Sequence, residues 1–324
     1  MDFTDIAATR AGLHAFELQG IDLLPPLDPA LEEFWTTVEL PLTPAWPCRC
    51  KVVRPRPAPG AAPRPLVVLF FGGAFAVGTP DMVTRPARDV AARLGAVVVA
   101  PDYQRRPEHA FPAPGHSAWA LLAHLARRAA DPAFGADPAR GFVVGGVSAG
   151  GSLAVVCGAL AAAGPPRAAA LGVEPLAAPL TGVFANGPLL LAPETVPGEF
   201  RAVFTSRDEN AGLEGFNNPQ VDEVLAFYQP DVASPWFSPL AVLDDIGTGG
   251  TVPPKFYFQV GRLDTLRDDA VVVEKLLARK GVPTRIDVLP DDGHTAWVAL
   301  PVESRSTNPT IEEATMAGFE WLLS

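Results

Sequence analysis

Residues 142–152 constrain this chain more than any other part of its sequence. An apolar run at residues 142–144 leads into Gly-Val-Ser-Ala-Gly at residues 146–150, and small residues then continue to Ala163. This order predicts a buried strand, a sharp turn that carries Ser148, and a closely packed helix. Such a turn exposes the serine oxygen and directs the next backbone N–H toward an attacked carbonyl. Ser148 is therefore the candidate nucleophile; the alternative is a glycine-rich turn whose serine is idle.

Apolar runs alternate with helical patterns along most of the remaining chain. The runs occupy residues 66–71, 96–100, 255–260 and 284–289, and the helical patterns occupy residues 115–130, 268–280 and 311–323. Apolar strands separated by helices indicate a mostly parallel sheet that is covered on both faces. The predicted fold class is therefore α/β, and 324 residues suit one such unit with an inserted lid.

The N-terminal segment has a different pattern. Residues 1–45 carry helical patterns at 4–19 and 29–34 that are interrupted by prolines, so we expect an N-terminal cap arm. Residues 46–187 and 244–324 are expected to form the catalytic core, which begins with a strand at residues 46–54.

Residues 188–243 interrupt the alternation of strands and helices. This segment begins with an apolar run at 189–191 that resembles a further core strand, and it continues with short helical patterns at 200–206 and 221–228. Short helices placed over the end of a sheet suit a cap or lid, where loops contribute to binding. The alternative is a surface excursion without function.

Composition argues against several classes of protein. The chain has 36 acidic and 25 basic side chains, for a net charge of −11, whereas a nucleic-acid-binding protein needs a basic face. No signal peptide is expected from the acidic N-terminus, and glycines interrupt the uncharged stretch at residues 142–166, so no membrane span is expected. Cys48, Cys50 and Cys157 show neither a disulfide framework nor a metal-ligand pattern, which favours a cytoplasmic location.

Four features follow predicted strands: the Gly72-Gly73 pair, Ser148, Asp264 and His294. Ligands bind at the carboxyl ends of such strands, and the order Ser, Asp, His is that of an α/β-hydrolase triad. His294 is expected to take the proton of Ser148 and return it to the leaving group. Asp264 is expected to fix the imidazole tautomer. Its competitors are Asp268 and Asp269, but this pair would begin the next helix, where carboxylates suit the helix dipole.

Backbone N–H groups are the expected donors to the oxyanion. We assign this role to Gly73 and Ala149, with Gly72 as a further candidate, and losing one such donor typically costs about 3 kcal/mol. Aromatic side chains near these positions favour an apolar cleft for the substrate. The candidate pocket residues are Phe71, Phe75, Tyr103 and Trp297.

Together these motifs resemble those of the hormone-sensitive-lipase-like carboxylesterases, which have the α/β-hydrolase fold. The resemblance extends from about residue 66 to residue 294 and is carried by residues 71–75, 102–113, 146–151, 238–240, 261–268 and 293–294. It implies a cap built from the N-terminal arm and the middle insertion, no metal or organic cofactor, and hydrolysis of esters with short to medium acyl chains.

The chain departs from this family in three places. Phe71 stands where the oxyanion loop usually has a histidine, and Val147 stands where an aspartate usually precedes the nucleophile. Residues 295–297 are Thr-Ala-Trp where the family usually has Gly-Phe. The missing histidine normally braces the oxyanion loop, so the sequence leaves open what supports the loop here.

Three hypotheses follow. The first is a serine esterase that acts on a small-molecule ester. The second retains the fold for acyl transfer, lactone opening or condensation of a polyketide-like or other specialised metabolite, a role in secondary metabolism. The third is a ligand-binding relative without turnover, which the intact triad disfavours. A homodimer is left open, because the sequence does not give the oligomeric state.

Overall fold

An eight-stranded sheet with strand order β1-β2-β4-β3-β5-β6-β7-β8 is the frame of the structure, a computed structural model. It describes residues 2–60, 62–213, 216–248, 250–294, 305, 307 and 309–324. The strands are β1 (Leu31–Leu40), β2 (Trp46–Pro55), β3 (Leu66–Phe70), β4 (Val97–Pro101), β5 (Phe142–Val147), β6 (Gly182–Asn186), β7 (Lys255–Gly261) and β8 (Thr284–Leu289). Strand β2 is antiparallel to both β1 and β4, and the other neighbouring strands are parallel.

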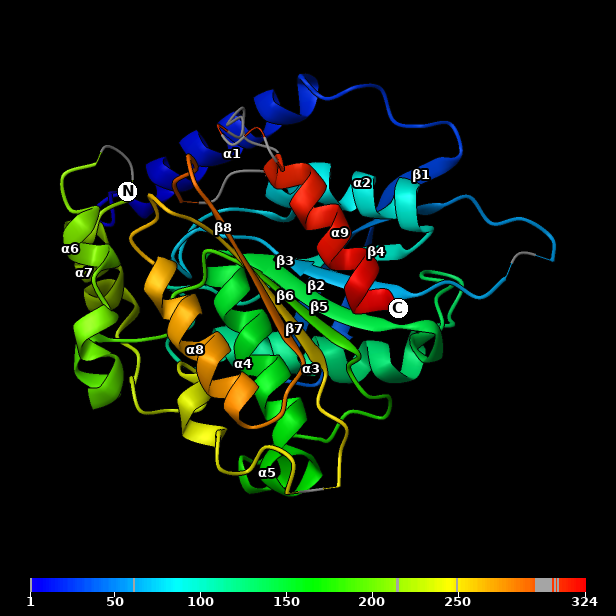
Figure 1. Cartoon of the computed structure of the whole chain (residues 1–324). Helices are drawn as coiled ribbons and strands as arrows, with labels where there is room; N and C mark the ends of the chain where they lie inside the picture. The colour runs from blue at the N-terminus through cyan, green and yellow to red at the C-terminus, as the bar shows by residue number, and fades with distance from the viewer. Residues whose placement is uncertain are drawn as a thin grey trace.

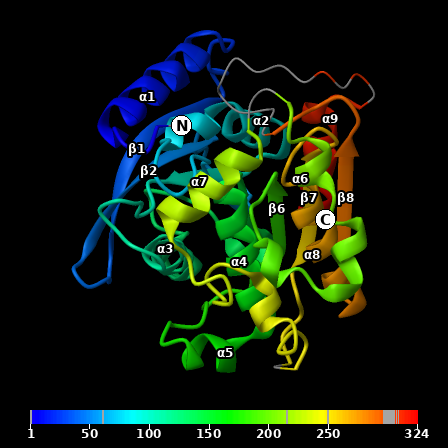
Figure 2. The ribbon, with the colours of Figure 1, turned by 90° about the vertical axis from the view of Figure 1, so that its left-hand side faces the viewer.

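Helices cover both faces of the sheet (Figure 1). The α-helices are α1 (Ile6–Asp22), α2 (Thr84–Leu94), α3 (Ala113–Arg128), α4 (Ala149–Ala163), α5 (Pro165–Ala170), α6 (Ser206–Glu209), α7 (Asn218–Tyr228), α8 (Arg267–Arg279) and α9 (Ile311–Leu323). Short 3-10 helices are η1 (Pro80–Val83), η2 (Pro138–Arg140), η3 (Pro193–Thr195), η4 (Gly198–Val203) and η5 (Pro239–Val242). Helices α3, α4 and α8 lie on one face and α2 and α9 on the other, while α1, α6 and α7 lie outside the sheet (Figures 1 and 2).

The central strands are apolar along their whole length because both faces are covered. Every residue of β3, β4 and β5 is buried, and β-branched valine supplies two of the five residues of β3 and three of the five of β4. The predicted α/β fold with a mostly parallel sheet and flanking helices is therefore confirmed. Among the described residues, no helix is both long enough and apolar enough to cross a bilayer.

The helical pattern expected at residues 29–34 is wrong. Strand β1 begins at Leu31 and pairs with β2 in a register that runs from Leu31 opposite Pro55 to Leu40 opposite Trp46. Burial explains the difference, because Leu31, Val38 and Leu40 pack into the core once β1 pairs at the edge of the sheet. The expected cap arm at residues 1–45 therefore contains one strand of the sheet, and α1 is its helical part.

The strand expected at residues 189–191 is also wrong, because the strand at this place is β6. Leu190 and Leu191 are buried, but their N–H groups donate to Oδ1 of Asp269, at 3.0 and 2.8 Å, and not to a neighbouring strand. A buried carboxylate thus replaces the strand ladder as the acceptor for this backbone. The short helices η4, α6 and α7 lie in the insertion, as expected.

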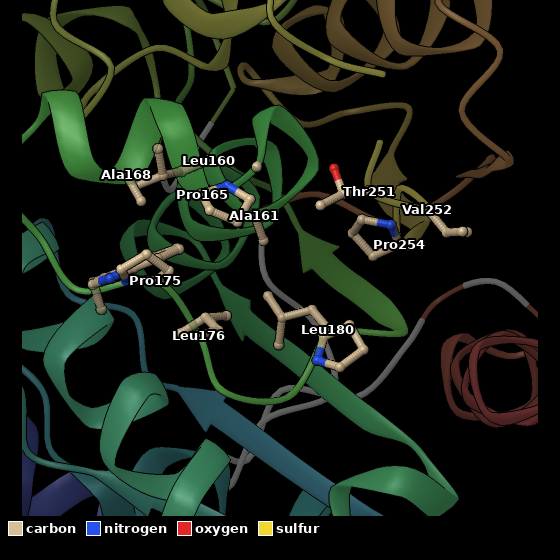
Figure 3. Close-up of a pocket in the computed structure, with 13 residues that line it drawn as sticks. Leu160, Ala161, Pro165, Ala168, Pro175, Leu176, Leu180, Thr251, Val252 and Pro254 are labelled. Atoms are coloured by element: carbon tan, nitrogen blue, oxygen red, sulfur yellow. The ribbon is translucent and has the colours of Figure 1, made fainter. Parts of the chain in front are cut away.

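A cavity of about 280 Å³ lies at the C-terminal end of α4 (Figure 3). Its lining is largely apolar and comprises Trp119, Leu160, Ala161, Gly164, Pro165, Ala168, Pro175, Leu176, Pro179, Leu180, Thr251, Val252 and Pro254. Helix α4 has 15 residues and begins directly after Ser148, so the cavity is about 20 Å from this serine along the helix axis. It is therefore separate from the candidate site.

Two helical glycines predict opposite effects of a single methyl group. A Cβ atom on Gly318 of α9 would lie 2.0 Å from Cε1 of Tyr257, whereas Gly12 of α1 has no atom within 4 Å of its Cβ position. We expect Gly318→Ala to lower the free energy of unfolding by about 1–3 kcal/mol through overpacking. Gly12→Ala should raise it by about 0.5–1 kcal/mol through lost unfolded-state entropy. Urea unfolding measures both; equal stabilisation by the two variants would contradict the packing of α9.

Candidate active site

The turn between β5 and α4 holds Ser148 in a conformation that few L-residues adopt. Its φ is 53° and its ψ is −121°, and its N–H donates to the carbonyl oxygen of Asn186 at 2.8 Å. A Cβ on Gly150 would lie 2.2 Å from the carbonyl oxygen of Phe70, and one on Gly146 would lie 2.4 Å from the backbone of Gly150. Only glycine allows this close approach, which leaves the half-buried Ser148 at the carboxyl end of the sheet.

Three predicted side chains meet at this edge. Nε2 of His294 lies 3.0 Å from Oγ of Ser148, and Nδ1 lies 3.0 and 3.1 Å from the two carboxylate oxygens of Asp264. Asp264 is buried, and its Oδ1 also accepts the N–H of Leu266 at 2.8 Å. The imidazole is thus oriented by a fixed carboxylate on one side and faces a hydroxyl on the other. This is the geometry of a nucleophile, a base and a group that orients the base.

The competing carboxylates are engaged elsewhere. Oδ2 of Asp268 accepts the N–H groups of Thr205 and Ser206, both at 2.7 Å, and Oδ1 pairs with Arg267 at 2.8 Å. Burial would raise the pKa of Asp268, but the guanidinium and the two N–H donors outweigh burial and hold this pKa below its ordinary value. Asp269 is fully buried, and burial raises its pKa above the ordinary value despite its cationic and N–H partners. Both residues lie in the first turn of α8, as expected.

The backbone after β3 runs beside the nucleophile, since a Cβ on Gly72 would lie 3.2 Å from Cβ of Ser148. The N–H of Gly72 points to Sδ of Met82 at 3.3 Å, which corrects its expected role as an oxyanion donor. Within the described part of the chain, the N–H groups of Gly73, Ala74 and Ala149 donate no hydrogen bond. Ala74 is therefore a further candidate donor to an oxyanion, which the sequence analysis missed because the motif there has alanine in place of glycine.

The predicted pocket residues have a different environment from the one expected. Phe71 and Tyr103 are buried and stack with ring centroids 4.4 Å apart, and the Tyr103 hydroxyl donates to the Phe71 carbonyl oxygen at 3.1 Å. Phe75 is buried against Tyr228, with ring centroids 4.0 Å apart. These three side chains therefore pack against other aromatic rings and do not offer a surface to substrate. Trp297 lies outside the described residues.

Two further residues contact the acid and base and were not found from the sequence. The Phe216 ring stacks on the His294 imidazole, with centroids 4.4 Å apart and planes 21° apart. Gly187 has a φ of +54°, and a Cβ there would lie 2.8 Å from Oδ2 of Asp264 and 3.1 Å from Nδ1 of His294. No motif marks either position, since the first lies in the insertion and the second follows a strand that the pattern did not reveal.

Comparison with known proteins places these observations in a family context. A family model described as the alpha/beta hydrolase fold matches residues 67–298. An AB hydrolase superfamily protein of Schizosaccharomyces pombe is 32% identical over 72% of this chain and 63% of its own length. Carboxylesterase NlhH of Mycobacterium tuberculosis is 31% identical over 71% of this chain and 66% of its own length. The chain thus matches slightly less than two thirds of the length of these curated relatives.

The arrangement of the whole chain is also shared with a solved structure. The crystal structure of vibralactone cyclase has a TM-score of 0.78 and 25% sequence identity, and the match covers 98% of this chain and 89% of that one.

A methyl group at Gly187 tests the arrangement of the acid and base. Gly187→Ala should displace Asp264 and His294 and slow the labelling of Ser148 by a fluorophosphonate probe about 100-fold, because a displacement near 1 Å has effects of this size. Gly172→Ala is the matched control, since Gly172 has a φ of +71° with no atom within 4 Å of its Cβ position. Both variants place a Cβ on a residue with positive φ, so the control also carries backbone strain. Equal labelling rates in the two variants would contradict the close approach at Gly187.

Proposed function

Because this chain belongs to the α/β-hydrolase fold family, we propose that it hydrolyses carboxylic esters through an acyl-enzyme on Ser148. The predicted relation to hormone-sensitive-lipase-like carboxylesterases is confirmed by the family match and by carboxylesterase relatives. One observation carries the proposal: Ser148 Oγ lies 3.0 Å from His294 Nε2, and His294 Nδ1 lies 3.0 Å from Asp264 Oδ2.

Acylation begins when Ser148 attacks the ester carbonyl and His294 takes the hydroxyl proton on Nε2. Asp264 keeps the other imidazole proton on Nδ1 and stabilises the imidazolium that forms. The tetrahedral oxyanion accepts hydrogen bonds from the N–H groups of Gly73, Ala74 and Ala149. When the intermediate collapses, His294 returns its proton to the leaving alcohol.

Deacylation repeats these steps with water as the nucleophile. His294 removes a proton from the water molecule that attacks the acyl carbon, and it then protonates Ser148 as the carboxylic acid leaves. The Phe216 ring covers one face of the imidazole, which blocks displacement of the base toward that side. Helix α1 and the insertion at residues 188–243 form the cap in this proposal.

Three substitutions test the assignment with p-nitrophenyl acetate and butyrate as substrates. Ser148→Ala and His294→Ala should each lower kcat by about 10⁶-fold, as in other enzymes whose triad acts as a unit. Asp264→Asn should lower it by about 10⁴-fold through the wrong tautomer. His124→Ala is the control, since this histidine lies in α3, and its kcat should stay within about twofold of the wild type.

The same variants are treated with a fluorophosphonate probe, which reports the nucleophile without turnover. Labelling should be lost in Ser148→Ala and retained in His124→Ala. Persistent labelling of Ser148→Ala, or ester cleavage that survives it, would sink the assignment of the nucleophile.

A second candidate reaction passes the acyl group to an alcohol in place of water. The similarity to vibralactone cyclase over 98% of this chain favours it, since a hydroxyl group of the same substrate can resolve an acyl-enzyme as a lactone. The discriminating measurement is the product ratio of ester to acid with increasing alcohol at fixed water activity. A ratio that saturates at low alcohol concentration would support acyl transfer, and one that follows the bulk alcohol-to-water ratio would support hydrolysis.

Two expectations from the sequence complete this proposal. Small-molecule esters are the expected substrates, and the cytoplasm is the expected location. The triad motifs support the first expectation, and the absence of a disulfide pattern in the sequence supports the second.

A further inference from the structure

The loop after β3, residues 72–78, has a backbone that needs external support; we name it the oxyanion loop. Three consecutive residues have positive φ: Gly73 at 120°, Ala74 at 55° and Phe75 at 57°. Each non-glycine residue in this region costs about 1–2 kcal/mol, so such a loop persists only where its surroundings fix it. The histidine that usually braces this loop in the family is Phe71 here.

The loop is closed on itself at its C-terminal half. The carbonyl oxygen of Gly73 accepts the N–H groups of Ala76 and Val77, both at 2.9 Å. Gly73 cannot be replaced, because a Cβ there would lie 2.2 Å from the carbonyl oxygen of Val77. Whatever holds Ala76 therefore also fixes the backbone of Gly73 and Ala74, the two loop donors of the proposed oxyanion hole.

Helix α1 contacts the oxyanion loop at Ala76 and the chain directly after it at Thr79, through the side chains of Arg10 and Glu17. Nε of Arg10 donates to the carbonyl oxygen of Ala76 at 2.8 Å. Both carboxylate oxygens of Glu17, two turns along the helix, accept from Thr79: its N–H at 3.1 Å and its hydroxyl at 2.6 Å. The two contacts are on the same face of α1, since residues seven apart align on a helix.

The side chains of Arg10 and Glu17 are themselves held in place. Arg10 also donates to the carbonyl oxygen of Arg106 at 2.6 Å and pairs with Glu108 at 2.7 Å. Glu17 is buried, and buried carboxylates almost always have partners, as Glu17 has in Thr79. Phe16 and Leu18 of α1 are exposed and Leu13 packs against the core, so α1 docks through apolar packing as well as through these polar contacts.

We propose that Arg10 and Glu17 are positioning residues of the esterase reaction, which hold the oxyanion loop so that the N–H groups of Gly73 and Ala74 face the developing oxyanion. The inference rests on the proposed function and gives the N-terminal segment a role in it. Neither residue touches the substrate; both act through the backbone from Ala76 to Thr79.

Burial raises the pKa of Glu17 to about 7, against the opposing effect of the two Thr79 donors. The neutral carboxyl group is therefore well populated at neutral pH. A glutamine at this position reproduces the neutral form, because its carbonyl oxygen accepts the Thr79 N–H and its amide donates to the Thr79 hydroxyl oxygen. Glu17→Gln should consequently preserve the hydrogen bonds to Thr79.

The test compares kcat and KM for p-nitrophenyl butyrate with the inhibition constant of a trifluoromethyl ketone, which forms the tetrahedral oxyanion on the serine. Arg10→Ala and Glu17→Met should each lower kcat about 10- to 100-fold, less than or equal to the loss of one donor, with KM nearly unchanged. The inhibition constant should rise by the same factor as kcat/KM falls. Glu17→Gln should keep kcat and the inhibition constant near their wild-type values. Leu18→Ala, on an exposed face of α1, should leave both of these constants unchanged.

Several outcomes would overturn this inference. They are unchanged kcat in folded Arg10→Ala and Glu17→Met, a loss confined to KM, ketone binding that does not follow kcat/KM, or failure of both variants to fold. The last result would assign the two residues to stability alone. A wild-type protein that cleaves no ester and takes no fluorophosphonate label would instead refute the proposed function, so the two failures are distinguishable.

Discussion

Close approach of three backbone segments around Ser148 is the constraint on which the rest of the site depends. The end of β3 passes so near the start of α4 that a Cβ on Gly150 would lie 2.2 Å from the Phe70 carbonyl oxygen. On the other side, the Ser148 N–H is bound to the end of β6 through Asn186. Parallel strands bring these ends to one edge, and glycine lets them meet. The nucleophile and the donors of the proposed oxyanion hole are therefore placed by one packing arrangement.

Buried polar groups fix the acid by a separate arrangement. Asn210 in the insertion donates to the carbonyl oxygen of Asp264 at 3.2 Å, and Ser206 donates to that of Thr265 at 2.9 Å. Asp268 in turn accepts two N–H groups from the insertion, so the loop after β7 and the insertion are joined by hydrogen bonds in both directions. Breaking one partner of such a network leaves a buried polar group unsatisfied. The insertion thus helps to hold the acid in place.

The sequence predicted those parts of the protein whose signal is local. The strand, turn and helix around Ser148 follow from residues adjacent in the chain, and Asp264 and His294 follow from their places after apolar strands. Strand β1 was missed because its partly exposed edge position gives a mixed pattern. The pocket assignment of Phe71 failed because the sequence does not distinguish an aromatic side chain that faces substrate from one that packs on another ring. Phe71 packs on Tyr103.

The contacts that support the oxyanion loop show why a local motif does not predict the whole site. Where the family has a histidine, Phe71 stacks on Tyr103, and the Arg105 guanidinium lies 5.1 Å from the Phe71 ring. The Arg106 N–H donates to the Phe75 carbonyl oxygen at 2.9 Å, and the Arg105 guanidinium donates to the Gly78 carbonyl oxygen. Further contacts come from Arg10 to Ala76 and from Glu17 to Thr79, each pair more than sixty residues apart in the chain. The loop that lacks the family's usual histidine is thus supported by an aromatic stack and by polar contacts from other segments. Because these contacts come from residues distant in sequence, the motif alone suggests a loop without support. In the folded protein the same contacts hold the backbone of the loop.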